Sequence, residues 1–269
     1  MDRQRGYLLS IISFLHPISL FSPKSFKFLE TRNPFRRTQY SHSPLYPRKE
    51  ARALPIKATQ DSVDYSLYLV TSGTDKDIDC LLEKVKAALS GGVTILQYRD
   101  KHNSTRDMIR MGKELLHLAH SFQVPLLLND RVDVALAIDA DGVHIGQDDM
   151  PLVMARRLLG YGKIIGVSVG NEEEAIVAEQ QGANYVGVGS IFATFSKADA
   201  GEPIGLQALR SIASAVSSIP VIAIGGINEQ NASQCIQNGA KGVAVISAIL
   251  SSNDPQQAAI NLKKQIVHL

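Results

Sequence analysis

Two cations and an amide at the end of one apolar run could bind a phosphorylated substrate. Gln97, Arg99 and Lys101 alternate along the chain, so all three would face one side of an extended segment. An arginine and a lysine together suit a diphosphate, because the guanidinium binds two oxygens at once and the ammonium adds a compact charge. The alternative is a solvated loop in which Asp100 is the partner of these cations.

Carboxylates follow the next two apolar runs. Asp130 comes directly after Asn129, and Asp149 comes directly after Asp148. Two carboxylates at neighbouring strand ends could hold Mg²⁺, which takes one or two carboxylates, several waters and substrate phosphate oxygens. Helix capping is the alternative, because acids and amides are favoured at the start of a helix. Capping does not explain why acids on adjacent strand ends would face a nearby pair of cations.

Further strand ends carry hydroxyls, an ammonium, a glycine and an isoleucine. These are Ser168, Thr194, Ser196, Lys197, Gly226, Ile246 and Ser247. Hydroxyls and an ammonium on the long loop over residues 190–205 suit a lid that closes on phosphate, although an ordinary surface loop is the alternative. Gly226 would let backbone N–H groups approach a phosphate, or it could form a plain tight turn. His144 stands alone in a strand, which favours a packed or barrel-lining role over metal ligation.

Eight apolar runs alternate with eight amphipathic stretches from residue 66 onward, and this order predicts a (β/α)8 TIM barrel. The runs are almost continuously apolar, which is typical of parallel strands buried on both faces. The predicted strands are 67–70, 93–97, 125–128, 142–145, 164–167, 185–189, 221–224 and 242–246. The predicted helices are 77–89, 105–121, 131–137, 151–159, 172–181, 206–217, 229–238 and 255–266. A doubly wound open sheet is the alternative fold. In a barrel, polar groups directly after the strands lie at the catalytic end.

The N-terminal extension, residues 1–57, differs in composition from the predicted barrel domain, residues 58–269. It carries eleven Lys and Arg residues against three acids, whereas the whole 269-residue chain has a formal net charge of +2. This basic, acid-poor composition predicts an organellar transit peptide. The tripeptide at residues 56–58 resembles a plastid processing site, which favours a plastid over a mitochondrion. A secretory signal over residues 7–21 and a disordered basic tail are the alternatives. If the extension is not a presequence, we expect the protein in the cytoplasm.

Other compositional features narrow the classes of function. No apolar run reaches the roughly 18 residues of a membrane-spanning helix, so we expect no membrane partner. The acidic barrel domain argues against nucleic-acid binding. Cys80 and Cys235 have no partner at metal-ligand spacing and are predicted to be buried thiols.

Motifs along the barrel domain resemble those of thiamine-phosphate synthases, in the family's order. They are the segments 68–71, 97–101, 129–137, 141–149, 166–168, 185–189, 194–197, 223–227 and 245–248. The resemblance covers residues 66 to about 269. It implies an enzyme that joins hydroxymethylpyrimidine diphosphate to thiazole phosphate, which gives thiamine phosphate and releases diphosphate. Both substrates are small molecules, and a homo-oligomer is compatible with the resemblance.

The resemblance also assigns roles to individual positions. It implies that the pyrimidine diphosphate contacts Gln97, Arg99, Lys101, Asn129, Ser168 and Lys197, with Arg99, Lys101 and Lys197 neutralising the leaving diphosphate. It implies that Asp130 and Asp149 hold Mg²⁺. The thiazole phosphate would bind Thr194, Ser196, Gly226, Ile246 and Ser247. Ser196 stands where the family usually has threonine, and because the hydroxyl is kept we expect a modest effect.

Two other functions remain as alternatives. A thiazole tautomerase uses a similar barrel for isomerisation and needs neither diphosphate nor metal, so it would have no use for Arg99, Lys101, Asp130 and Asp149 together. An inactive phosphate-binding regulator would bind the substrates without releasing diphosphate.

Overall fold

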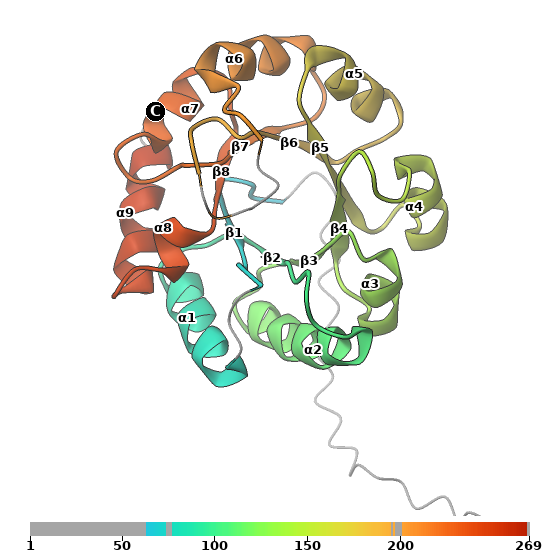
Figure 1. Cartoon of the computed structure of the whole chain (residues 1–269), viewed down its shortest axis with the longest axis vertical. Coiled ribbons are helices and arrows are strands. Elements are labelled where there is room, and N and C mark those ends of the chain that lie inside the picture. The colour runs from blue at the N-terminus through green and yellow to red at the C-terminus, as the bar shows by residue number, and fades with distance from the viewer. Residues whose placement is uncertain (1–62, 74–76, 195, 197–200, 268–269) are drawn as a thin grey trace, which may run out of the picture. The chain divides into compact units, whose positions relative to one another are not determined.

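A computed structural model describes residues 63–73, 77–194, 196 and 201–267. The predicted presequence, residues 1–57, and Lys197 lie outside these residues. Eight parallel strands pair in chain order, and β1 also pairs with β8, so the sheet closes into a barrel (Figure 1). This closure confirms the predicted TIM barrel and excludes the open sheet. The strands are β1 (Leu67–Val70), β2 (Ile95–Tyr98), β3 (Leu126–Asn129), β4 (Gly142–Ile145), β5 (Ile164–Val169), β6 (Tyr185–Val188), β7 (Val221–Ile224) and β8 (Gly242–Val245).

The strands form where apolar residues follow one another without interruption, because both faces of each strand are covered. All four residues of β1, β2, β3, β6 and β8 are buried. The predicted ends differ in two places that affect the site. Asn129 is the last residue of β3 and Ser168 lies inside β5, so each belongs to a strand and not to the loop after it.

Helices surround the barrel (Figure 1), and their buried apolar residues belong to the same hydrophobic core as the strands. They are α1 (Ile78–Ser90), α2 (Thr105–Ser121), α3 (Val132–Ile138), α4 (Leu152–Leu159), α5 (Glu172–Gln180), α6 (Gly205–Ala215), α7 (Ala232–Gln237), α8 (Ser247–Leu250) and α9 (Pro255–Val267). The short helix α8 was not predicted, because four residues form a single turn and show no helical period. The sequence placed Ser247 at a strand end, and the structure makes it the first residue of α8.

The two cysteines differ in environment. Cys235 is buried in α7, and burial raises the pKa of its thiol to about 12. Cys80 is exposed in the first turn of α1, so the prediction of a buried thiol is wrong there. Helix α1 turns Leu81 and Val85 toward the barrel, and Cys80 lies off that face. Across the described residues, no helix combines the length and the apolar character needed to cross a membrane.

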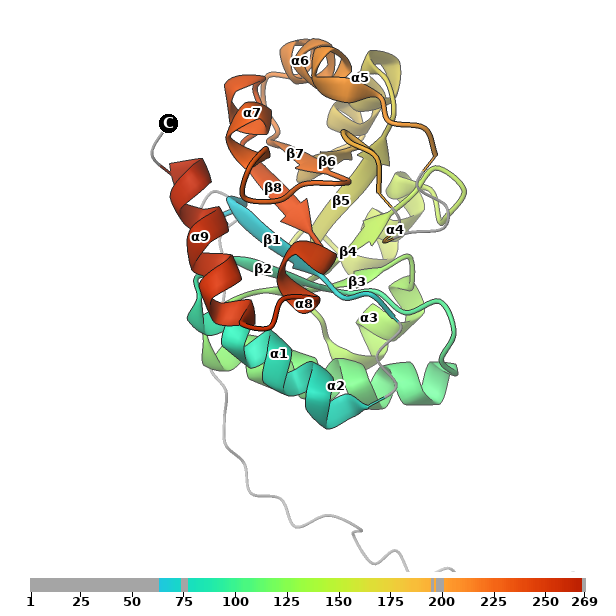
Figure 2. The same cartoon turned by 60° about the vertical axis from the view of Figure 1, so that its left-hand side comes forward.

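The last helix joins the beginning of the described chain. Helix α9 packs against α1 and β1, as the turned view shows (Figure 2). The ammonium of Lys263 in α9 lies 3.1 Å from a carboxylate oxygen of Asp64 and also donates a hydrogen bond to the hydroxyl of Ser66. The first and last described segments are therefore tied together beside the β1–β8 pairing.

Candidate active site

The cation and acid predicted to meet at the ends of β2 and β3 do meet. The ammonium of Lys101 lies 2.6 Å from the Oδ2 atom of Asp130. This hydrogen bond raises the pKa of Lys101 above its ordinary value. The Lys101 side chain is still 45% exposed, so its charge remains accessible to a ligand. Arg99, by contrast, is buried at 8% exposure.

The two predicted metal ligands lie next to each other. Burial raises the pKa of the Asp149 carboxyl, and its hydrogen bond with Asp130 adds to this rise. Burial acts in the same direction on Asp130, but hydrogen bonds with Asp149 and Lys101 outweigh it and hold the pKa of Asp130 below its ordinary value. Two carboxyl groups at hydrogen-bonding distance repel each other when both are charged, and a bound cation relieves that repulsion.

Helix capping does not account for these acids. Helix α3 begins after Arg131 and α4 begins after Pro151, and neither cap has a side-chain hydrogen bond. Asp149 instead accepts a hydrogen bond of 2.7 Å from the backbone N–H of Gly146, which folds the loop after β4 back on itself. Asp130 has a left-handed backbone, with φ of 61°.

The loop after β2 is held by partners that the sequence analysis did not identify. Thr71, the residue after β1, accepts a hydrogen bond from the backbone N–H of Arg99 at 2.8 Å and donates one to its carbonyl at 2.9 Å. Asp100 accepts from the backbone N–H groups of His102 and Asn103, at 2.8 and 2.9 Å. Asp100 therefore fixes its own loop, and the ion-pair partner of Lys101 is Asp130.

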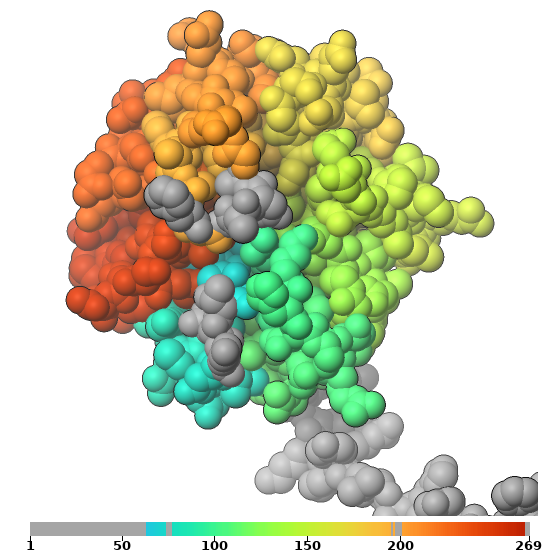
Figure 3. Space-filling view, in the orientation of Figure 1, coloured from blue at the N-terminus to red at the C-terminus, as the bar shows by residue number. Residues whose placement is uncertain are grey.

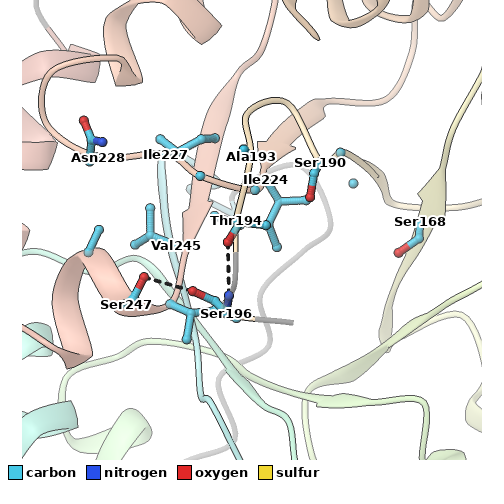
Figure 4. Close-up of a pocket in the computed structure, with 17 residues that line it drawn as sticks. Ser168, Ser190, Ala193, Thr194, Ser196, Ile224, Ile227, Asn228, Val245 and Ser247 are labelled. Carbon is cyan, nitrogen blue, oxygen red and sulfur yellow. Dashed lines mark hydrogen bonds between the residues drawn. The ribbon is translucent and has the colours of Figure 1, made fainter. Parts of the chain in front are cut away.

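A cavity of about 740 Å³ lies at the carboxyl ends of β5 to β8. Its lining includes six predicted substrate contacts: Ser168, Thr194, Ser196, Gly226, Ile246 and Ser247. The hydroxyls of Ser196 and Ser247 lie 2.9 Å apart, and Ser168 faces them from the other side of the cavity (Figure 4). The polar residues that line this cavity were therefore predicted from the sequence, with two exceptions. Ser190 and Asn228 also line it but were not among the predicted contacts.

The glycine turn after β7 belongs to this cavity for a steric reason. Gly225 and Gly226 both have positive φ, at 99° and 64°. A Cβ atom on Gly226 would lie 2.5 Å from the carbonyl oxygen of Ala193, and one on Gly225 would lie 2.5 Å from the hydroxyl of Ser190. The two glycines thus let the loops after β6 and β7 touch, and they leave backbone N–H groups beside the cavity.

The site consists of two groups of residues. The cavity lining does not include Gln97, Arg99, Lys101, Asn129, Asp130 or Asp149, which come from β2, β3 and the loops after β2 to β4. Segments from both halves of the chain meet around the centre of this end of the barrel (Figure 3). Gln147 connects the two groups, because its side-chain amide donates a hydrogen bond of 2.7 Å to the carbonyl of Ser168. Lys197 lies outside the described residues.

His144 lines the barrel interior, as predicted. Its Nδ1 atom lies 2.8 Å from the hydroxyl of Tyr185, and its Nε2 atom lies 2.8 Å from the hydroxyl of Ser168. The described residues include no group of three or more His, Cys, Asp or Glu side chains that could hold a metal ion. A metal at Asp130 and Asp149 would therefore take further ligands from water or substrate.

A closed parallel barrel with a polar cavity and a cation–carboxylate cluster at the carboxyl ends of its strands is typical of TIM-barrel enzymes, whose active sites lie at this end. The family described as thiamine monophosphate synthase matches residues 67–249, and the chain belongs to this family. The chain is 52% identical to the thiamine-phosphate synthase of Chloroflexus aurantiacus over 201 residues. The matched region covers 75% of this chain and 92% of that protein.

Two further relatives agree. The thiamine-phosphate synthase of Clostridium novyi is 48% identical over 74% of this chain and 98% of its own length. The solved structure of a thiamine phosphate pyrophosphorylase from Pyrococcus furiosus has a TM-score of 0.69 and 43% identity, covering 77% of this chain and 97% of that one. The predicted family and fold are therefore confirmed, and the chain is an enzyme of this type.

Proposed function

We propose that this enzyme joins hydroxymethylpyrimidine diphosphate to thiazole phosphate, with diphosphate as the leaving group. The observation that carries the proposal is the pairing of two anion-binding regions at one barrel end. One contains Arg99, Lys101 and the carboxylates Asp130 and Asp149; the other is the cavity of hydroxyls and glycines at β5 to β8. A reaction between a diphosphate ester and a phosphorylated partner needs two such regions side by side.

The carboxylate pair fits Mg²⁺. Asp130 and Asp149 offer two adjacent hard oxygen donors, and Mg²⁺ in proteins is commonly held by one or two carboxylates, waters and substrate phosphates. When bound there, the ion would neutralise charge on the diphosphate oxygens. Lys101 lies against Asp130 and would remain beside the metal and the diphosphate.

The chain's own residues stabilise the departing anion. Lys101 and Arg99 place positive charge where negative charge grows as the carbon–oxygen bond of the pyrimidine methylene breaks, and such preorganised charge lowers the barrier. We propose that Lys197 adds a third cation. The pyrimidine amino group shares the positive charge left on the methylene, so the step is dissociative. The thiazole nitrogen then attacks this carbon and forms the new bond without a general base.

The thiazole phosphate is held in the cavity by Thr194, Ser196, Gly226, Ile246 and Ser247. Hydroxyl and backbone N–H donors bind the phosphate, and glycine allows the backbone to come close. Binding through the phosphate places the thiazole nitrogen near the reacting carbon, which contributes by proximity. The short helix α8, which begins at Ser247, occupies the place after strand 8 where barrels often bind phosphate.

One assay tests this function and separates it from the alternatives. The purified chain is incubated with both substrates and Mg²⁺, and thiamine phosphate and diphosphate are measured. We expect both products in equal amounts and none when either substrate is left out. Conversion of a thiazole isomer alone would support a tautomerase, and binding without diphosphate release would support a regulator. Full turnover in excess chelator would contradict the metal role of Asp130 and Asp149.

We further propose that residues 1–57 form a plastid transit peptide. The segment is basic, rich in serine and poor in acids, which supports a presequence, and the tripeptide at residues 56–58 resembles a plastid processing site. A fusion of residues 1–57 to a fluorescent protein should enter isolated plastids and be shortened there. Import into mitochondria alone, or retention outside both organelles, would contradict the plastid address.

A further inference from the structure

A chain of hydrogen bonds runs through the barrel interior from Gln97 to Ser168. The amide Nε2 of Gln97 donates to the hydroxyl of Tyr68 at 2.7 Å, and the hydroxyls of Tyr68 and Tyr185 lie 2.8 Å apart. His144 then bridges Tyr185 and Ser168, with 2.8 Å on each side. We call these five residues, from β2, β1, β6, β4 and β5, the interior chain. It begins and ends at residues that we assign to the pyrimidine diphosphate.

The barrel makes room for this chain by omitting side chains. A Cβ atom on Gly166 in β5 would overlap the phenol ring of Tyr185, and one on Gly187 in β6 would lie 3.0 Å from Cε1 of His144. The imidazole of His144 stacks on the ring of Tyr185, with centroids 5.5 Å apart. Tyr68 and Tyr185 are each 1% exposed. Their hydroxyls are sealed from water, so the protein must satisfy their hydrogen bonds.

The order of donors and acceptors fixes the direction of the interior chain. Because the Tyr68 oxygen accepts from Gln97, one arrangement gives every proton of these five residues that lies inside the chain an acceptor: Tyr68 donates to Tyr185, and Tyr185 donates to Nδ1 of His144. The proton of a neutral His144 is then on Nε2, and it donates to the Ser168 oxygen. Reversing the direction would leave the Tyr68 proton without an acceptor among these five residues.

This direction determines what Ser168 presents to the cavity that it lines. With its oxygen accepting from His144, the Ser168 hydroxyl can turn its own proton toward the cavity (Figure 4). A phosphate oxygen at neutral pH accepts hydrogen bonds, so a donor attracts it. The opposite tautomer of His144 would take the Ser168 proton and turn an oxygen lone pair toward the anion.

We propose that Tyr68, Tyr185 and His144 are positioning residues that hold Ser168 as a hydrogen-bond donor toward the anionic oxygens of the pyrimidine diphosphate. This inference rests on the proposed function for the identity of the anion. The tautomer of His144 and the direction of the chain belong to the protein alone, and they can be measured without turnover.

The first test is the tautomer of His144. The full chain is labelled with ¹⁵N-histidine, and the signals of His144 are assigned by their loss in His144→Asn. We expect the proton of the neutral imidazole on Nε2. In Tyr185→Phe we expect a mixture of both tautomers, since the donor that keeps Nδ1 unprotonated is gone. A proton on Nδ1 in the unaltered protein would overturn the proposal, and it would do so whether or not the protein makes thiamine phosphate.

The second test is a double-mutant cycle on kcat/KM for the pyrimidine diphosphate. We expect Tyr185→Phe and Ser168→Ala each to lower it by about 10- to 100-fold, the usual effect of losing a hydrogen bond to a charged group. The double variant should lose no more than Ser168→Ala alone, and the KM for thiazole phosphate should not change. Additive losses would mean that Tyr185 does not act through Ser168, and would refute the proposal.

Tyr65 provides the matched control. Its ring lies 5.2 Å from that of Tyr185, centroid to centroid, and its hydroxyl is not part of the interior chain. Tyr65→Phe makes the same chemical change against the same ring, so we expect kcat/KM within about twofold of the unaltered enzyme. A loss equal to that of Tyr185→Phe would show that removing any nearby phenol hydroxyl has this effect, and would also refute the proposal.

Discussion

The close packing of Gly166 against Tyr185 predicts a large loss of stability in Gly166→Ala. The new methyl group would overlap the phenol ring of Tyr185 inside the barrel. Carbon atoms in contact are normally about 3.5–4.0 Å apart, so the ring would have to move by about an ångström or more. That movement would break the 2.8 Å hydrogen bonds of Tyr185 to Tyr68 and His144.

The magnitude follows from these two effects. Overpacking a core costs about 1–3 kcal/mol, and each lost hydrogen bond costs about 1 kcal/mol, so we expect a loss of about 3–5 kcal/mol. For a domain of this size, 1 kcal/mol corresponds to about 2–4 °C in Tm, which gives a decrease of about 6–20 °C. Thermal and urea unfolding followed by circular dichroism would measure both quantities.

Two further variants make the test specific. Gly162→Ala is the control, because a Cβ atom there would have no neighbour within 4 Å, and we expect a change below about 0.5 kcal/mol. In the Gly166→Ala background, Tyr185→Leu removes the overlapping ring, so the double variant should lose less stability than the sum of the single changes. A cost below about 1 kcal/mol for Gly166→Ala, or strict additivity, would refute the reasoning.

Three other predictions concern the site and the pH dependence of stability. Asp149→Asn keeps an acceptor for the Gly146 N–H but removes a carboxylate, so Mg²⁺-dependent turnover should fall at least about 100-fold. Asp148 is the exposed neighbour, and Asp148→Asn should change this turnover less than about twofold. Equal effects of the two variants in a Mg²⁺ titration would contradict the assignment of Asp149 as a metal ligand. Ser247→Ala should raise the KM for thiazole phosphate about tenfold with little change in the KM for the pyrimidine diphosphate. If steady-state kinetics showed both KM values rising together, the assignment of Ser247 to the thiazole phosphate would be wrong. The hydrogen bond that His120 donates to the carboxylate of Asp141 raises the pKa of His120. This pair therefore stabilises the fold fully below the unfolded-state pKa of about 6.5, and its effect is lost as pH rises through the higher folded-state value. The Tm advantage of the unaltered protein over His120→Asn should shrink with rising pH, and a constant advantage would contradict this.

The strands could be predicted because parallel strands buried on both faces leave a simple record in the sequence. Each predicted strand overlaps the observed one, and the differences are at the ends. The end of β5 is an example: Ser168 and Val169 continue the strand, since their backbones pair with Gly187 and Val188 of β6. That pairing depends on the neighbouring strand, so a polar serine at a strand end is not enough to locate the boundary.

The candidate site could be predicted where it depends on strand ends, and not where it depends on barrel closure. Lys101 and Asp130 follow adjacent strands, so their meeting required only the order of the strands. Tyr68 and Tyr185 were read as members of apolar strands, but 117 positions separate them in the chain and their hydroxyls meet only inside the closed barrel. The Tyr68–Tyr185–His144 connection therefore could not be predicted from local pattern.

The link between α9 and the start of β1 should allow the chain to be circularly permuted. Because Lys263 holds Asp64 and Ser66, a short peptide could join the two ends of the described fold without displacing a strand. New termini could then open at the exposed turn around Gly162, between α4 and β5. Such a circular permutant should close into the same ring of strands, since a ring has no first member.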